Sequence, residues 1–217
     1  PALCARARQQ AECRVYPSWG EMLEAEPLDV VYVFCDNAQG ADVGAAAARR
    51  GLHMLVEKPM AATLEGAERL LDAARATGVR LMINWPVVWR PQVQAALDIA
   101  ARSELGPIWQ LTHRAAHGGP DVECSPAFRE WIVDARRNGA GTLADLCCYG
   151  INMAQVLLGR PDRVTAVAGQ WREPPLPVDD HAIVVMSYPH AIATAEGAWG
   201  QIGHPLTGYL ATIWCAR

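Results

Sequence analysis

Apolar and polar residues alternate along the first part of the chain in a way that predicts strands separated by helices. The runs 28–37, 52–59 and 79–85 are short, largely apolar and rich in β-branched residues, as strands are. The first run, closed by polar turn-forming residues, is typical of a strand buried on both faces of a parallel sheet. Such an alternation predicts a doubly wound α/β sheet, which binds ligands at the carboxyl edges of its strands.

Helices are expected between these strands. The alanine-rich stretch 41–51 ends at Gly51, and the stretch 64–78 begins after Thr63 and ends at Gly78. Threonine and glycine commonly cap the N-terminal and C-terminal ends of helices, respectively. With these elements in place, the polar or reactive side chains at the carboxyl edge of the sheet are Cys35, Asn37, Lys58 and Asn84.

A second domain is expected after Pro86, where the pattern changes. A helix over about 92–103, a strand over about 107–117 and a loop over 118–126 come first. The stretch 141–159 is apolar at helical spacing and predicts one helix. Strand-like runs follow at 163–171, 181–188, 192–199 and 209–216. They predict an antiparallel sheet layer.

Composition excludes several classes of partner. The 19 basic and 23 acidic residues give a net charge of -4 without long runs, so no surface for a nucleic acid or an anionic membrane is expected. The apolar stretches are far shorter than the roughly 18 residues that span a bilayer. Seven cysteines form no Cys-x-x-Cys pair, which argues against a disulfide framework or a zinc site and fits a reducing cytoplasm. No metal site is expected, because the i, i+4 pair His113 and His117 lies in a predicted strand and loop.

Glu57-Lys58-Pro59 follows a buried strand, so the lysine ammonium would reach the crevice at the sheet edge. Desolvation there lowers the pKa of a lysine and the charge of Glu57 raises it, and the sequence leaves open which effect is larger. Lys58 is therefore a candidate acid or base. The alternative is a solvated loop lysine, since a single tripeptide is a weak motif.

Asp145 and Tyr149 are spaced i, i+4, which on one helix puts both side chains on the same face. Their polar ends could then meet at one ligand atom. The alternatives are an aspartate that stabilises the helix dipole and a core tyrosine with a satisfied hydroxyl.

Four blocks of the sequence together resemble the Gfo/Idh/MocA oxidoreductases, a family that includes inositol dehydrogenases. The blocks are YPSWGEMLEAEPLDVVYVFCDN, GLHMLVEKPM, GAGTLADLCCYGINMAQVLLG and VDDHAIVVMSYPHAIAT, within about 16–199. Tyr149 stands where the family more often has histidine, and it resembles the glucose-fructose oxidoreductase branch in this. Tyrosine ordinarily titrates near 10 and histidine near 6.5, so the proton transfer differs unless the lysine beside it lowers the tyrosine pKa.

The resemblance implies the fold class α/β, with a partial Rossmann-type parallel sheet over 1–85 that lacks the glycine-rich loop. An α+β domain with a large open, mainly antiparallel sheet would follow over 86–217, C-terminally incomplete, and would form a homo-oligomer through that sheet. The implied reaction is hydride transfer between NAD or NADP and a secondary alcohol or carbonyl of a sugar or polyol. The implied catalytic residues are Lys58, Asp145 and Tyr149, and the implied cofactor-binding residues are Cys35, Asn37, Glu57, Lys58, Pro59 and Asn84.

The sequence also departs from the family pattern. No Gly-x-Gly-x-x-Gly occurs, so the usual cradle for the dinucleotide phosphates is absent and would precede Pro1. Gly40 stands where the family commonly has histidine. A chain truncated at both ends, inactive by itself, is therefore expected. The alternatives to an enzyme are a cofactor-sensing or sugar-sensing binding protein of the same fold and an inactive fragment.

Overall fold

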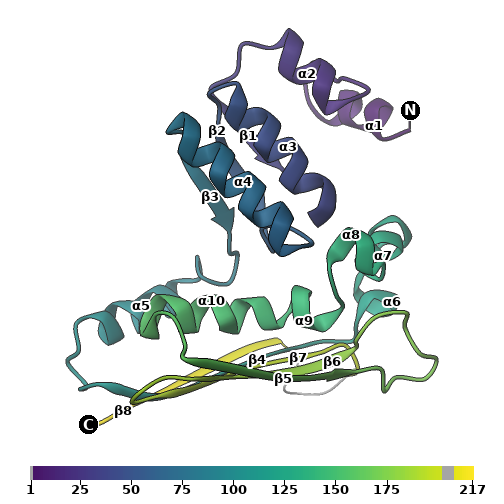
Figure 1. Ribbon diagram of the computed structural model, residues 1–217. Coiled ribbons are helices and arrows are strands. Elements are labelled where there is room, and N and C mark those ends of the chain that lie inside the picture. Colours follow the sequence, from purple (N-terminus) through teal and green to yellow (C-terminus); the bar gives the residue numbers. More distant parts are fainter. Residues whose placement is uncertain (1, 202–207) are drawn as a thin grey trace.

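The computed structural model describes residues 2–201 and 208–217, which contain two sheets one above the other (Figure 1). The first is a parallel sheet in the order β1-β2-β3, formed by β1 (Val30–Val33), β2 (His53–Glu57) and β3 (Leu81–Asn84). Helices α3 (Asn37–Arg49) and α4 (Leu64–Thr77) cover one of its faces (Figure 1). Helices α1 (Ala2–Gln10) and α2 (Trp19–Ala25) lie at the N-terminal end. The predicted strand-helix alternation is confirmed.

The prediction that the first strand is buried on both faces is wrong. Val31 and Val33 are buried, whereas Tyr32 and Phe34 are 67% and 66% exposed. The reason is the placement of α3 and α4, which both pack on the face that carries Val31 and Val33. The parallel sheet therefore has a covered face and an apolar open one.

The helix ends agree with the sequence at both ends of α4 and at the end of α3, where Gly51 follows Arg50 with φ 78°, but the start of α3 differs. The Thr63 hydroxyl accepts a hydrogen bond from the Gly66 amide at 3.1 Å, and Gly78 adopts the left-handed conformation with φ 69°. Helix α3 begins at Asn37, earlier than predicted, because the Asp36 carboxylate accepts from the Gln39 amide at 2.9 Å. Asn37 is thus the first residue of a helix rather than a loop residue.

The second sheet has the order β5-β6-β7-β4-β8. Its strands are β4 (Ile108–Ala116), β5 (Arg163–Gly169), β6 (His181–Ser187), β7 (Ile192–Ala198) and β8 (Gly208–Cys215). Neighbours run antiparallel except for β4 and β7, which are parallel. A parallel α/β sheet followed by a mainly antiparallel open sheet is the fold class predicted from the sequence, which is confirmed.

Helices separate the two sheets. Helices α5 (Pro91–Ala101), α9 (Thr142–Asp145) and α10 (Cys147–Leu158) lie on the face of the five-stranded sheet that is turned toward the parallel sheet (Figure 1). Three short helices gather at one end of this layer, α6 (Pro120–Glu123), α7 (Pro126–Ile132) and α8 (Ala135–Asn138). Helix α6 stands within the segment predicted to be a loop.

The stretch 141–159 forms two helices, so the prediction of one continuous helix is wrong. Helix α9 ends at Asp145, and α10 begins at Cys147 after Leu146, whose φ and ψ are -112° and -44°. Asp179 fixes the start of α9, because its carboxylate accepts from the backbone amides of Gly141 and Leu143, each at 2.7 Å. The break falls between Asp145 and Tyr149, the two candidates of this region.

Contacts between α3 and the segment around α8 hold the two sheets together. The Asn37 amide donates to the backbone oxygen of Asn138 at 3.0 Å, and Asp36 pairs with Arg137 at 3.0 Å. Gly139, with φ 100°, comes so close to Ala62 that a Cβ there would lie 2.5 Å from the Ala62 oxygen. These contacts fix the carboxyl edge of the parallel sheet against α9 and α10.

Candidate active site

The carboxyl edge of the parallel sheet brings Glu57 and Asn84 together. They are register partners at the ends of β2 and β3, and the Asn84 amide donates to the Glu57 carboxylate at 2.7 Å. The Trp89 indole donates to the oxygen of the same amide at 3.3 Å. Glu57 is therefore held by Asn84 and is not the carboxylate that pairs with Lys58.

Lys58 follows β2 and reaches across to the end of α9. Its Nζ atom lies 2.7 Å from Oδ1 of Asp145 and 2.8 Å from the backbone oxygen of the same residue. Both side chains are largely buried, at 11% and 15% exposure. The structure thus joins two of the predicted catalytic residues, 87 positions apart in the sequence, in a buried ion pair.

The break between α9 and α10 makes this contact possible. In a continuous helix the Tyr149 amide would donate to the Asp145 carbonyl. Here the Tyr149 amide donates to Leu146 at 3.3 Å, so the Asp145 carbonyl is left to accept from Lys58. The thiol of Cys148 lies 3.3 Å from that same carbonyl oxygen. The distortion of the helix therefore leaves a backbone acceptor available to Lys58.

Tyr149 lies directly beside the ion pair. The Lys58 ammonium is 4.8 Å from the centre of its ring, within the range of a cation–π contact. Trp85 and Tyr209 meet the ring edge-on, with ring centres 6.1 and 5.1 Å away. The three predicted catalytic residues thus form one cluster, enclosed by aromatic side chains.

The charges of this cluster are set by burial and by partners. Burial acts to lower the pKa of Lys58, but the negative charge of Asp145 and its hydrogen bond outweigh this and raise the pKa above its ordinary value. Burial raises the pKa of Tyr149, and the nearby Lys58 charge reduces that rise without reversing it. At neutral pH the cluster therefore holds a charged lysine and a protonated tyrosine, and the lysine does not bring the tyrosine pKa below its ordinary value.

The ammonium of Lys58 retains one donor. A protonated lysine has three N–H groups. Asp145 accepts through its carboxylate and its backbone oxygen. One N–H is left for an oxygen atom of a ligand, which is the arrangement needed to bind a hydroxyl or a carbonyl.

Cys35 and Asn37 stand at the same edge with different surroundings. Burial, with a contribution from the Asp36 charge, raises the pKa of the Cys35 thiol to about 11, so this thiol is protonated at neutral pH. Asn37 is buried, and its amide donates to Asn138. Its side chain thus joins α3 to α8, and its predicted role as a cofactor ligand stays a prediction.

Sequence reasoning did not identify Tyr209, and it considered His113 only as a metal ligand. Tyr209 touches Tyr149, and the His113 ring lies 6.4 Å from the rings of both tyrosines. One signal was present for His113, which occupies an inward position of β4 between the buried Leu111 and Ala115. Nothing in the sequence marked Tyr209, which comes near Tyr149 only through the pairing of β8 with β4.

Within 2–201 and 208–217, no three histidine, cysteine, aspartate or glutamate side chains gather as metal ligands do. In the same part of the chain, every helix is too short or too polar to cross a bilayer.

Comparisons with known proteins agree with this arrangement. Residues 2–85 match the family model described as "Oxidoreductase family, NAD-binding Rossmann fold". Residues 93–213 match the model described as "GFO/IDH/MocA C-terminal domain". The two matches follow each other along the chain in the order of the two sheets.

Curated relatives are similar over part of their length. The chain is 32% identical to D-xylose 1-dehydrogenase (NADP(+)) 2 of Haloferax volcanii over 162 residues, which are 73% of the chain and 46% of that protein. It is 30% identical to dTDP-3,4-didehydro-2,6-dideoxy-alpha-D-glucose 3-reductase of Streptomyces antibioticus over 200 residues, 92% of the chain and 58% of that protein. The chain thus spans about half the length of the curated relatives it matches.

Solved structures share the fold. Levoglucosan dehydrogenase in complex with NADH and levoglucosan superposes with a TM-score of 0.88 at 23% identity, over 100% of this chain and 60% of that one. An inositol dehydrogenase homolog from Azotobacter vinelandii complexed with NAD+ gives 0.86 at 24% identity, over 97% and 57%. At these identities the likeness concerns the fold.

Proposed function

The chain belongs to the Gfo/Idh/MocA family of oxidoreductases, and we propose that it carries the substrate side of a nicotinamide-dependent dehydrogenase site. The reaction is hydride transfer between NAD or NADP and a secondary alcohol or carbonyl of a sugar or polyol. One observation carries this proposal: the Lys58 ammonium is anchored on Asp145 beside Tyr149, with one N–H left for a substrate oxygen. The sugar-acting names of the curated relatives support the substrate class.

The residues at the sheet edge fit the nicotinamide end of such a cofactor. Glu57, Asn84 and Lys58 combine hydrogen-bond acceptors and donors on adjacent strand ends, the groups that ribose hydroxyls and a carboxamide require. We assign the cofactor-binding role to them together with Cys35, Asn37 and Pro59. By the same proposal 1–85 forms the dinucleotide-binding side and 86–217 the substrate side. The chain contains no glycine-rich phosphate loop, so these residues hold only part of a dinucleotide.

The chemistry divides between the cofactor and the chain. The nicotinamide supplies hydride transfer to or from the substrate carbon. Lys58 donates its free N–H to the substrate oxygen, and Asp145 keeps the ammonium oriented and charged. Tyr149 gives a proton to that oxygen when a carbonyl is reduced, and takes one when an alcohol is oxidised. Because the pKa values of Lys58 and Tyr149 are both raised, oxidation requires the loss of a firmly held proton, and its rate rises with pH.

A substrate panel with two variants tests the proposal. Aldoses, ketoses and polyols are assayed with NAD and NADP, both on the 217-residue chain and on the longest protein that its gene encodes. In whichever protein is active, Lys58→Met and Tyr149→Phe each lower kcat by about 10² to 10⁴. Tyr188→Phe is the control and leaves kcat unchanged, because Tyr188 directly follows β6 and does not belong to the cluster. Wild-type turnover of Lys58→Met contradicts the proposal, and cofactor binding without turnover on any sugar favours a binding protein.

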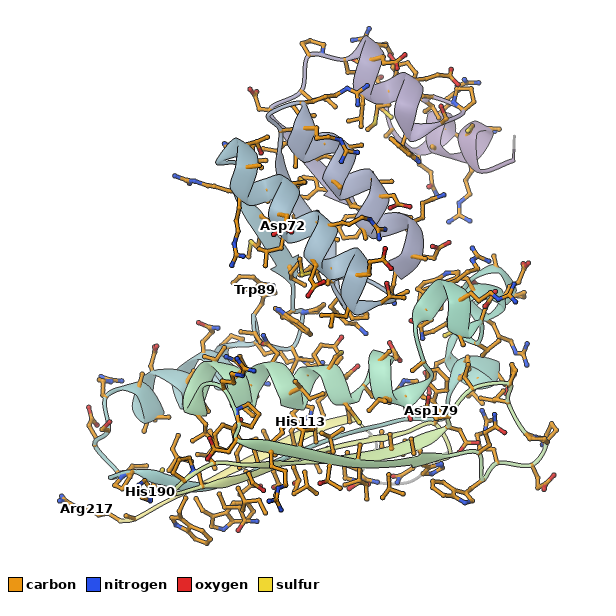
Figure 2. All side chains as sticks on the ribbon, in the orientation of Figure 1. Asp72, Trp89, His113, Asp179, His190 and Arg217 are labelled. Atoms are coloured by element: carbon orange, nitrogen blue, oxygen red, sulfur yellow. The ribbon has the colours of Figure 1, made fainter. Side chains whose placement is uncertain are left out.

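We propose further that the protein forms a homo-oligomer through the five-stranded sheet. The outer face of this sheet, turned away from α10, exposes apolar side chains on four strands: Val167, Ile183, Ile192, Leu210 and Trp214. Figure 2 shows side chains standing below the sheet with no helix over them. Exposed apolar surface of this kind is typical of an interface. A monomer by light scattering at micromolar concentration contradicts this proposal.

We place the protein in the cytoplasm. All seven cysteines are free, including Cys147 and Cys148, which are buried neighbours in α10. Thiols persist unpaired in a reducing compartment. Fractionation of cells that express the natural gene checks this proposal.

A further inference from the structure

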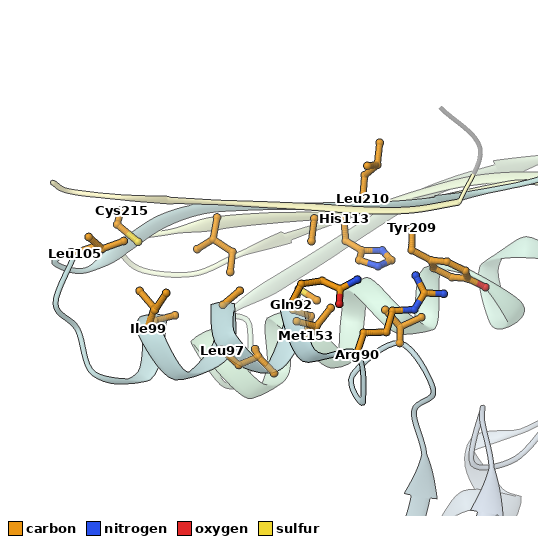
Figure 3. A pocket seen from close by; sticks show the side chains of 16 residues that line it. Arg90, Gln92, Leu97, Ile99, Leu105, His113, Met153, Tyr209, Leu210 and Cys215 are labelled. Carbon is orange, nitrogen blue, oxygen red and sulfur yellow. The ribbon is translucent and has the colours of Figure 1, made fainter. Parts of the chain in front are cut away.

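A cavity of about 490 Å³ lies between helix α5 and the five-stranded sheet (Figure 3). This volume is within the range of about 300 to 1,000 Å³ that small-molecule sites occupy. Its walls come from α5, from β4 and β8 of the sheet, and from Met153 of α10. Neither Lys58 nor Asp145 lines it, and it adjoins their cluster only at Tyr209, which lines the cavity and contacts Tyr149.

Most of the lining is apolar. Val93, Ala96, Leu97 and Ala100 form one face of α5 at helical spacing. Val93 and Leu97 pack partly against the core, yet no residue of α5 is fully buried, and this face borders the cavity. Ile99, Leu105 and Cys215 lie together at the end farthest from Tyr209 (Figure 3). This end therefore suits the hydrocarbon part of a ligand.

The other end is polar and contains a buried histidine without a partner. His113 is 2% exposed, and within 2–201 and 208–217 neither of its ring nitrogens has a hydrogen-bond partner. Figure 3 shows its ring pointing into the cavity next to Arg90 and Gln92. Burial lowers the pKa of His113 to about 4, so the neutral ring has one N–H to donate. A buried polar side chain normally has a partner, and a ligand in the cavity would supply it.

Arg90 adds a positive charge at this end. Its guanidinium lies 5.1 Å from the centre of the Tyr209 ring. Among the described residues, no carboxylate pairs with it. Arg90, Gln92 and Tyr209 are all donors on the cavity wall, and they stand on the side where His113 has its free N–H. Among the described residues that line it, the polar end thus offers a cation and neutral donors and contains no carboxylate.

We propose that this cavity binds a small carboxylate with an apolar body, such as a medium-chain fatty acid. The carboxylate lies at Arg90 and accepts from His113 and Gln92, and the hydrocarbon extends along α5 toward Ile99 and Leu105. The proposal does not depend on hydride transfer, since it concerns binding to residues outside the Lys58–Asp145 pair.

Calorimetric titration of the 217-residue chain tests it, with decanoate as the probe below its micelle concentration. Decanoate binds saturably at one site, and decanol, which has no charge, binds about tenfold more weakly or worse. Arg90→Gln weakens decanoate binding by about tenfold and leaves decanol unchanged. Arg163→Gln is the matched control, because Arg163 is exposed at the start of β5 and has no carboxylate partner among the described residues; it leaves both affinities unchanged.

A second variant tests the location. Ala96→Phe fills the apolar part of the cavity and abolishes binding of both probes, with folding checked by circular dichroism. If Ala96→Phe does not fold, Ala100→Leu takes its place. Equal binding of decanoate and decanol, an equal effect of Arg90→Gln and Arg163→Gln, or undiminished binding to the filled variant overturns the proposal.

Discussion

Helices α10 and α5 lie on the same face of the five-stranded sheet but meet it in different ways. Helix α10 buries most of its first two turns against the sheet, and Gly150 permits the approach, since a Cβ there would lie 2.6 Å from that of Ala195. Helix α5 buries none of its residues and leaves a cavity beneath it. Helix α10 is closely packed, whereas α5 contacts the core only partly, through Val93 and Leu97, and borders the cavity.

The polar groups beside the two helices differ accordingly. At the start of α10, Lys58 is fixed by the carboxylate and the carbonyl of Asp145. Beneath α5, the part of the chain that the structure describes gives His113 no hydrogen-bond partner and places Arg90 over the face of Tyr209. The closely packed helix α10 thus lies beside a charged group held in one position, as catalysis requires. The loosely packed helix α5 lies beside hydrogen-bond donors that a ligand could engage. Substitutions beside either helix test this difference.

The largest effect on stability is expected beside α10, from Lys58→Met. This change leaves the carboxylate of Asp145 without its partner at 15% exposure, which costs about 3 to 5 kcal/mol of unfolding free energy. Urea denaturation measures it. Arg69→Met is the control, because Arg69 and Asp42 form an ion pair at 49% and 62% exposure, whose loss costs about 1 kcal/mol or less. Equal losses in the two variants would show that the Lys58–Asp145 contact is not formed in solution.

The sequence offers a direct probe of the same contact, because Lys58 is its only lysine. Lysine labelled with carbon-13 at Cε gives one side-chain signal, and its titration reports the pKa of Lys58. That pKa lies above the ordinary value in the wild type and falls in Asp145→Asn. A raised pKa means that the contact stabilises the fold below the unfolded-state pKa and that this contribution is lost as pH rises through the folded-state pKa.

The region around α10 and the Lys58–Asp145 pair could be predicted from the sequence in part. The strands of both sheets follow from runs of apolar residues, and Lys58, Asp145 and Tyr149 were identified together through the family resemblance. The break at Leu146 could not be predicted, since the apolar spacing of 141–159 is continuous and contains no proline. At the break, the Asp145 carbonyl accepts from Lys58, and that lysine comes from a distant part of the chain.

The cavity beneath α5 could not be predicted from the sequence. The apolar face of α5 has the pattern of any helix that packs on a sheet, and the pattern does not tell contact from empty space. Arg90 and Tyr209 meet only because β8 pairs with β4, a long-range pairing that local patterns do not specify.

A smaller effect on stability, which depends on pH, is expected beneath α5, from His113→Leu. With a pKa of about 4 in the folded chain and the ordinary 6.5 in the unfolded one, His113 takes up its proton first in the unfolded state. Stability is therefore unaffected above pH 6.5 and falls as pH drops toward 4, by about 2 kcal/mol at pH 5. His113→Leu removes this part of the acid destabilisation, which urea denaturation at several pH values measures.

The control for this prediction is His190→Leu. His190 is exposed in the turn between β6 and β7, so its loss tests the effect of removing an imidazole without burial. Burial also lowers the pKa of His117. Because His117 is present in the wild type and in both variants, its contribution to the pH dependence is the same in all three. If His113→Leu and His190→Leu have the same pH dependence, then His113 is protonated in the folded chain and the cavity is open to water.

Effects of similar or smaller size, but of opposite sign, are expected from the same substitution made on each helix. Ala154→Leu on α10 enlarges a fully buried alanine in a packed core, which costs about 1 to 3 kcal/mol. Ala96→Leu on α5 extends into the cavity, where the added methyl groups are buried without displacing neighbours, and it gains up to about 1 kcal/mol. The two substitutions add the same atoms to helices on the same sheet face, so opposite signs in urea denaturation isolate the effect of packing. A loss for Ala96→Leu as large as that for Ala154→Leu would mean that α5 closes onto the sheet in solution, and the contrast between the two helices would be lost.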